Sequence, residues 1–222
     1  MNSPFRKHAA YALDAAVAAF VVLGVVLVFT IGLGGEKATF LSASKFFTFQ
    51  SNVLVGLCCL VCLPFDILVA IGKKNAKPAL LPLLLRIGSV GTTLTFLIVI
   101  CFLGPTMGYP LMFESGNLYL HLIVPLLTLV RVIFFELEAP WNKFRTTFFG
   151  IIHMAAYGVF YMVNLAIHNG YGTAAYDWYG FGAYGLGIGF LFFFGSLLLT
   201  YGISFLIYFA QKKFIAFSNK QK

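Results

Sequence analysis

The chain has 222 residues, of which 60% are hydrophobic and 10% are charged, and 26 of them are phenylalanine. A soluble domain needs a largely polar surface, so this composition excludes a single soluble domain and indicates an integral membrane protein. We interpret the net charge of +8 as a mark of membrane topology and of contact with anionic lipids, because a bundle of membrane helices offers no basic surface for nucleic acid.

Six apolar runs are each long enough to cross a bilayer as a helix, which takes about 20 residues. In chain order they cover residues 9–33, 46–71, 79–103, 117–135, 146–167 and 181–209. The first run follows Arg6 and Lys7, as in a signal peptide, but it is longer than the roughly 7–15 apolar residues of such a peptide. We therefore expect a retained first helix and one all-α domain, residues 1–222, built as a polytopic bundle of six transmembrane helices.

Basic residues are distributed unevenly between the two ends of these runs. The N-terminus, the second and fourth loops and the C-terminus carry eleven of them, whereas the other three loops carry two. Because cytoplasmic loops of membrane proteins are enriched in lysine and arginine, both termini are expected in the cytoplasm.

Polar residues in three of the runs recur at steps of three, four or seven, which places them on one side of each helix. They are Thr48, Ser51, Asn52, Cys59, Cys62 and Asp66 along the second run, His121, Pro125, Thr128 and Arg131 along the fourth, and His153, Tyr157, Tyr161, Asn164 and, just past its end, His168 along the fifth. Polar groups that face lipid have no partners, so these sides are expected to line a shared interior.

Five ionisable residues lie four to eight residues from the cytoplasmic ends of their runs. They are Asp14, Asp66, Arg86, Arg131 and His153. Isolated buried charges are costly, so we expect a structural layer of mutually paired charges that fixes the register of neighbouring helices. The alternative is a proton or ion relay, which uses the same residue types and would make the protein a transporter.

A second polar layer is expected near the outer ends of the helices. There a hydroxyl, Thr48, and an imidazole, His121, offer the two groups needed for nucleophilic catalysis, in which the histidine takes the hydroxyl proton and the oxygen attacks a carbonyl. The side chains of Asn52, Gln50 or Asn164 would supply N–H donors for the developing oxyanion. The alternative is that these residues only join helices, in a lipid-binding or scaffold protein without turnover.

Two short stretches resemble the motifs of a known family. KFFTFQSN at residues 45–52 and LHLIVP at residues 120–125 are similar to the two motifs of the FAR-17a/androgen-induced-protein family. The segment HNGYGTAAYDWYGF at residues 168–181 is similar to that family's sequence before the last helix. Animal members are multi-pass membrane hydrolases of fatty acid esters of hydroxy fatty acids, which rely on a threonine and a histidine at the positions of Thr48 and His121.

The resemblance implies a threonine nucleophile, Thr48, with His121 as its base, and a lipid-ester substrate in the membrane. Gln50, Ser51 and Asn52 follow the nucleophile in a variant that is more similar to bacterial members, as is the absence of proline after Tyr179. We therefore expect a bacterial plasma-membrane protein with its site near the extracytoplasmic side.

Further residues are assigned supporting roles in this site. His168 or Asp177 would orient His121, and Asn164 lies near the same outer level. An acyltransferase would use the same acyl-threonine with a different acceptor. The sequence has no nucleotide-binding glycine loop, no H-E-x-x-H pattern and no G-x-S-x-G elbow, so neither a cofactor nor a metal is expected. Membrane lipids are the only partners that it indicates.

Overall fold

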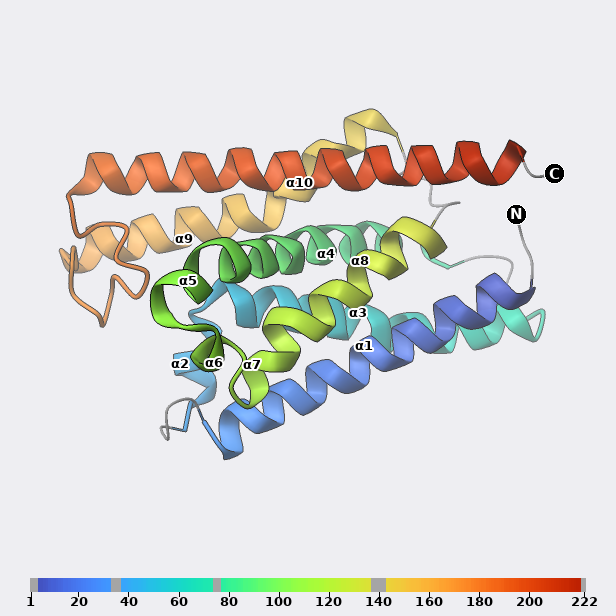
Figure 1. Cartoon of the computed structure of the whole chain (residues 1–222), viewed down its shortest axis with the longest axis horizontal. Coiled ribbons are helices and arrows are strands. Elements are labelled where there is room, and N and C mark those ends of the chain that lie inside the picture. The colour runs from blue at the N-terminus through green and yellow to red at the C-terminus, as the bar shows by residue number, and fades with distance from the viewer. Residues whose placement is uncertain (1–3, 33–36, 74–76, 137–142, 221–222) are drawn as a thin grey trace.

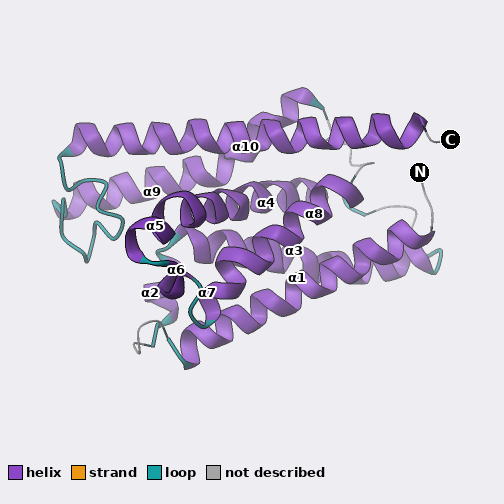
Figure 2. Cartoon of the chain, in the orientation of Figure 1, coloured by secondary structure: helices purple, strands orange, loops and turns teal. Residues whose placement is uncertain are grey.

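The computed structural model describes residues 4–32, 37–73, 77–136 and 143–220. In chain order the helices are α1 (Pro4–Thr30), α2 (Phe40–Ser44), α3 (Phe47–Ala70), α4 (Leu80–Ile98), η1 (Val99–Leu103), α5 (Gly104–Met107), α6 (Tyr109–Met112), α7 (Gly116–Leu118), η2 (Tyr119–Ile123), α8 (Val124–Phe135), η3 (Phe144–Ile151), α9 (Ile152–His168) and α10 (Leu186–Lys220). The described part of the chain contains no strand (Figure 2). It is an all-α protein, as the sequence predicts.

Six helical segments are long and apolar enough to span a membrane. They are Phe5–Thr30, Phe47–Val69, Leu80–Met107, Gly116–Phe135, Phe144–His168 and Leu186–Ser218. These segments confirm the predicted six-helix membrane protein. Residue 33, the last of the first predicted run, lies outside the described residues.

The two ends of the chain lie at the same end of the bundle, which we call the terminal end (Figure 1). The opposite end, here called the loop end, carries α2, the short helices α5 to α7 and the connection between α9 and α10. The start of α3 therefore lies at the loop end, together with the π-helical turn η2 that precedes α8.

The helix α4 occupies the centre of the bundle. It contacts α3, α8, α9 and α10. In the most apolar stretch of the segment Leu80–Met107, to which α4 belongs, 61% of the residues are buried, against 22% in that of Leu186–Ser218 in α10. Fully buried apolar side chains of α4 and of other helices form one cluster; they include Val17, Val55, Leu85, Val124 and Leu165. A helix surrounded by other helices can carry small polar residues, and Ser89 and Thr92 of α4 are both fully buried.

The last helix differs most from its predicted bounds of 181–209. It begins at Leu186, because residues 180–185 form turns with positive φ at Gly180 (69°) and Gly185 (94°). It continues to Lys220 because Gln211 is buried and donates to the carbonyl of Val132, which keeps this part of the helix against α8. The apolar run in the sequence ends before Lys212 and Lys213, and the prediction ended there too. Lysine and glutamine are good helix formers, so the helix itself continues beyond the apolar run.

Candidate functional site

The amide of Asn52 joins the start of α3 to the turn that carries His121. Its Nδ2 donates to the carbonyl oxygen of Thr48, one helical turn earlier, at 2.8 Å, and to that of Leu120 in η2 at 2.9 Å. Asn52 is fully buried, and no described residue bonds its Oδ1. One side chain thus fixes the turn of the candidate nucleophile relative to that of the candidate base.

A proline makes the carbonyl of Leu120 available to Asn52. The N–H of Val124 bonds the carbonyl of Tyr119 rather than that of Leu120, which makes η2 a π turn. The next residue, Pro125, has no N–H to give. The carbonyl of Leu120 therefore has no donor from its own helix in either register, and Asn52 supplies one. Such π turns are frequent at functional sites.

A second π turn, η1, also leaves a carbonyl without a helical donor ahead of a proline. The free carbonyl is therefore a consequence of the backbone geometry. There the N–H of Gly104 bonds the carbonyl of Val99, and Pro105 has no N–H. The carbonyl of Ile100, left without a helical donor, accepts from the hydroxyl of Tyr109 at 2.8 Å. In both π turns a side chain from outside the turn donates to the carbonyl five residues before the proline.

The imidazole of His121 is buried and held in one orientation. It is 8% exposed, and its Nδ1 lies 2.7 Å from the carbonyl oxygen of Met112 in α6. A carbonyl oxygen only accepts, so Nδ1 carries a proton, and in the neutral ring Nε2 holds the lone pair. This is the tautomer that a general base requires, with a backbone carbonyl in the orienting position that a carboxylate takes in other sites.

Thr48 is half-buried in the first turn of α3. The first N–H groups of a helix have no acceptor within it, and the N-cap residue Phe46 supplies no side-chain bond. The hydroxyl of Tyr179 accepts the N–H of Phe47 at 2.9 Å. Within the described ranges, no bond is formed by the N–H groups of Thr48 and Phe49, and none joins the Thr48 hydroxyl to His121. Two backbone donors are thus free beside the candidate nucleophile.

The neighbours of Thr48 use their donors on the backbone. Gln50 Nε2 donates to the carbonyl of Ser44 at 2.7 Å, which holds α2 against the start of α3. Ser51 is fully buried, and its hydroxyl donates to the carbonyl of Thr48 at 3.1 Å. Both hydrogen bonds brace the turn around Thr48.

The three expected supporting residues near α9 organise the loop 169–185. Asn164 Nδ2 donates to the carbonyl of Tyr176 at 2.9 Å, and the ring of His168 stacks on Tyr176 with centroids 4.2 Å apart. The carboxylate of Asp177 accepts the N–H groups of Gly172 and Gly182 at 2.9 and 3.0 Å. It also accepts the hydroxyl of Tyr161. Their described hydrogen bonds therefore go to this loop and to α9 rather than to His121.

That loop reaches the residues that flank Thr48, through aromatic side chains that sequence reasoning treated only as an interfacial anchor. Tyr157 of α9 donates to the carbonyl of Lys45 at 2.7 Å, and the indole N–H of Trp178 donates to the Tyr157 hydroxyl at 2.9 Å. Burial raises the pKa of Tyr179, in the loop, to about 12, so its hydroxyl stays neutral at physiological pH. The sequence signal for these contacts was the aromatic run at residues 178–181, next to the candidate residue Asp177.

The charged residues near the terminal end divide into a network and two outliers. Asp14 accepts from Nε and Nη2 of Arg131 at 2.9 and 3.1 Å. Two residues outside the expected layer complete the network: Lys77 Nζ lies 2.5 Å from Asp66 Oδ1, and Arg131 Nη1 lies 2.7 Å from Glu136 Oε2. Lys77 lies between α3 and α4, and Glu136 follows the last residue of α8, so neither belongs to a helical stripe that spacing reveals.

Arg86 and His153, also expected in this layer, lie elsewhere. Arg86 donates to Gln211 Oε1 of α10 at 3.3 Å. The ring of His153 packs on Phe47, with centroids 4.7 Å apart, and so lies under the first turn of α3. The five residues therefore do not form a single layer: Asp14, Asp66 and Arg131 belong to the network, and Arg86 and His153 each lie apart from it.

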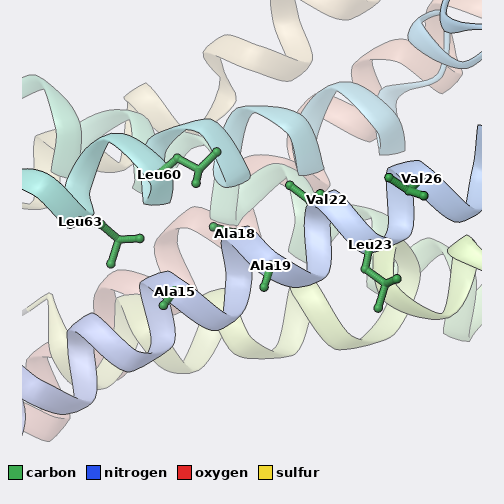
Figure 3. A pocket seen from close by; sticks show the side chains of 8 residues that line it. All are labelled: Ala15, Ala18, Ala19, Val22, Leu23, Val26, Leu60 and Leu63. Carbon is green, nitrogen blue, oxygen red and sulfur yellow. The ribbon is translucent and has the colours of Figure 1, made fainter.

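An apolar groove runs along α1 beside α3 (Figure 3). Small side chains of α1, including Ala15, Ala18 and Ala19, form its floor, and Leu60 and Leu63 of α3 form one wall. Its lining contains none of the candidate site residues. Its surface is suited to the hydrocarbon of a bilayer.

Comparisons of the chain with models of protein families, with curated proteins and with solved structures found no match. The site is therefore interpreted from its own geometry.

Proposed function

We propose that the protein is an intramembrane hydrolase of fatty-acyl esters, such as fatty acid esters of hydroxy fatty acids, with Thr48 as nucleophile and His121 as general base. One observation carries this proposal: the side chain of Asn52 ties the turn of Thr48 to that of His121, whose Nδ1 is committed to Met112 and whose Nε2 is left basic. The resemblance of residues 45–52 and 120–125 to the FAR-17a/androgen-induced-protein family supports the same assignment.

The reaction begins when Nε2 of His121 takes the hydroxyl proton of Thr48 and Oγ1 attacks the ester carbonyl. In the absence of substrate such a pair is often too far apart to bond, and it tightens in the complex. The free N–H groups of Thr48 and Phe49 are placed to stabilise the oxyanion, a contribution that is typically about 3–4 kcal/mol per donor.

The tetrahedral intermediate collapses when the ester oxygen leaves with the proton from His121. The acyl group then remains on Thr48. Nε2 next takes a proton from water, the hydroxide attacks the acyl-threonine, and the fatty acid leaves as the proton returns to Thr48. No charge accumulates on Met112, whose carbonyl only holds the ring in orientation.

The site belongs to the loop end, and in this proposal it faces the extracytoplasmic side of a bacterial plasma membrane. The excess of basic residues at the terminal end supports this orientation, and the similarity of residues 50–52 to bacterial members of the family supports the bacterial source. A lipid ester enters sideways from that leaflet, because its acyl chains remain in hydrocarbon while the ester reaches the first turn of α3. Water for deacylation comes from the same surface.

The test is intact-protein and peptide mass spectrometry after treatment with a fluorophosphonate probe. We expect one adduct on the peptide that contains Thr48, absent from Thr48→Ala and His121→Ala. Two matched controls should keep it: Thr30→Ala removes an exposed threonine whose hydroxyl bonds its own helix, and His8→Ala removes an exposed histidine near the terminal end. If the folded wild type forms no adduct, the proposal is wrong, and lipid binding without turnover or transport becomes the better explanation.

A further inference from the structure

The network near the terminal end contains more negative than positive charge. Its described members are the carboxylates of Asp14, Asp66 and Glu136 and the cations of Lys77 and Arg131, which gives −3 + 2 = −1 if all are ionised. Asp14, Asp66 and Arg131 are at most 1% exposed. An uncompensated charge at such a position is costly, so something must neutralise it.

Neither cation can restore the balance by losing its proton. Arginine is always charged in proteins. Burial and the charge of Arg131 lower the pKa of Lys77, but its hydrogen bond to Asp66 and the negative charge there outweigh them, so the pKa is raised overall. Lys77 therefore stays an ammonium ion, and the surplus charge lies on the three carboxyl groups.

Among the three, only Asp66 has a buried oxygen that lacks a partner. Both oxygens of Asp14 are bonded to Arg131, and Glu136 contacts Arg131 with a side chain that is 17% exposed. Asp66 Oδ1 contacts Lys77, whereas Oδ2 is buried and no described residue bonds it. A bare carboxylate oxygen in such surroundings costs more than a neutral hydroxyl group there.

Titratable groups of several segments interact with Asp66. They are Asp14 and Tyr11 from α1, Cys62 from its own helix α3, Lys77 from the segment before α4 and Arg131 from α8. Lys77 Nζ lies between the two acids, 2.5 Å from Asp66 Oδ1 and 3.9 Å from Asp14 Oδ2.

We propose that Asp66 Oδ2 is a proton-binding site, and that this proton balances the charge of the network that holds α1, α3 and α8 together at the terminal end. With the proton bound, two carboxylates face two cations. When the proton leaves, one uncompensated negative charge appears between three helices, so packing at this end weakens as the pH rises. The site is independent of Thr48 and His121.

Infrared difference spectroscopy of the purified protein in lipid nanodiscs tests the protonation of Asp66 directly, because a protonated carboxyl group absorbs at a different frequency from a carboxylate. We expect a protonated-carboxyl band in the wild type at neutral pH that disappears on alkalinisation. Asp66→Asn should abolish the band, whereas Glu114→Gln, which changes an exposed acid at the loop end, should leave it. Absence of the band from the wild type, or its persistence in folded Asp66→Asn, would overturn the proposal.

Thermal unfolding at several pH values gives a second, independent result. Asparagine resembles the neutral acid in shape, so Asp66→Asn should match the wild type below about pH 4, where the carboxyl group is protonated in the folded and the unfolded chain alike. Above that pH the unfolded chain gives up the proton that folded Asp66 keeps, so the stability of the wild type declines as the pH rises. Asp66→Asn should lack this decline and should be the more stable protein at neutral pH. Asp14→Asn removes one negative charge by another route, so Asp66 should ionise and the infrared band should vanish there too. If Asp66→Asn instead destabilises the protein at every pH, Asp66 acts as a carboxylate and the proposal is wrong.

Discussion

Asn52 Nδ2 lies 2.9 Å from the carbonyl oxygen of Leu120, a contact between residues 68 positions apart in the chain. The contact exists because the π turn and Pro125 together leave that carbonyl without a helical donor. Hydrogen bonds between membrane helices average about 0.6 kcal/mol and reach about 1.7. The main effect of the hydrogen bond between Asn52 and Leu120 is to position the turn of His121 relative to the turn of Thr48, rather than to add stability.

Replacing Asn52 should therefore cost both stability and activity. Asn52→Ala removes two hydrogen bonds and leaves the Leu120 carbonyl without a donor, so we expect a loss of about 1–3 kcal/mol in the free energy of unfolding. Asn52→Asp keeps the shape but opposes carboxyl oxygens to two carbonyl oxygens, so it should be no better. Asn164→Ala, which removes one bond at a half-buried position, is the control and should cost less than 1 kcal/mol. Equal losses in Asn52→Ala and Asn164→Ala would contradict this view of the site.

Pro125→Ala separates the π turn from the stability of the helix. Alanine restores an N–H, so the turn can return to α-helical geometry, and we expect unchanged or higher thermal stability. The same change rotates His121 relative to Thr48, and misplacements of about 1 Å can cost 100-fold in rate. We therefore expect ester hydrolysis to fall at least tenfold. Pro105→Ala makes the same change in η1, which does not carry His121, and should lower activity much less; equal losses in both variants would exclude a specific role for η2.

Asparagine in place of His121 distinguishes orientation from base chemistry. Its side-chain N–H can still donate to Met112, so His121→Asn should fold with a melting temperature close to that of the wild type. Removal of the basic Nε2 should lower the hydrolysis rate by about 100- to 10,000-fold, the usual contribution of a general base. Activity assays paired with thermal unfolding provide the comparison. A fully active His121→Asn protein would remove His121 from the reaction.

The six membrane helices could be predicted because each needs only a long apolar run, which is a local property of the sequence. Thr48, Asn52 and His121 could be placed at one level because depth follows from helical rise. The contact between Asn52 and Leu120 could not, since its acceptor is a backbone carbonyl that side-chain patterns do not reveal. Pro125, four residues after His121, was the readable sign that a carbonyl near His121 lacks a donor. Lys77 was missed because it lies between two helices, where residue spacing does not assign it to a helix face.

The pair of Asp14 and Arg131 should show the cost of a single unpaired buried charge. Arg131→Met leaves Asp14 without its partner, so we expect a destabilisation of about 3–5 kcal/mol. The double variant Asp14→Leu with Arg131→Met removes both charges and should recover most of that loss, because buried pairs contribute little net stability. A thermal-unfolding cycle over the four proteins measures the coupling. Additive effects of the two changes would show that the two side chains do not interact.

Tyr179 connects the outer loop to α3, and its titration gives that contact a pH signature. Its pKa is raised from its usual 10.0 to about 12, because burial disfavours the phenolate. The folded protein thus binds more protons than the unfolded chain between these values, so this residue's contribution is complete below about pH 10 and is lost as the pH rises toward 12. Tyr179→Phe removes the acceptor of the Phe47 N–H and should cost about 1 kcal/mol at neutral pH. Compared with the wild type, its stability should also decline less between pH 10 and 12, and thermal unfolding of both proteins across that range measures the difference. Tyr201→Phe, a matched change on α10 away from the loop, should keep the wild-type decline, and parallel curves for Tyr179→Phe and the wild type would show that Tyr179 titrates as an exposed tyrosine does.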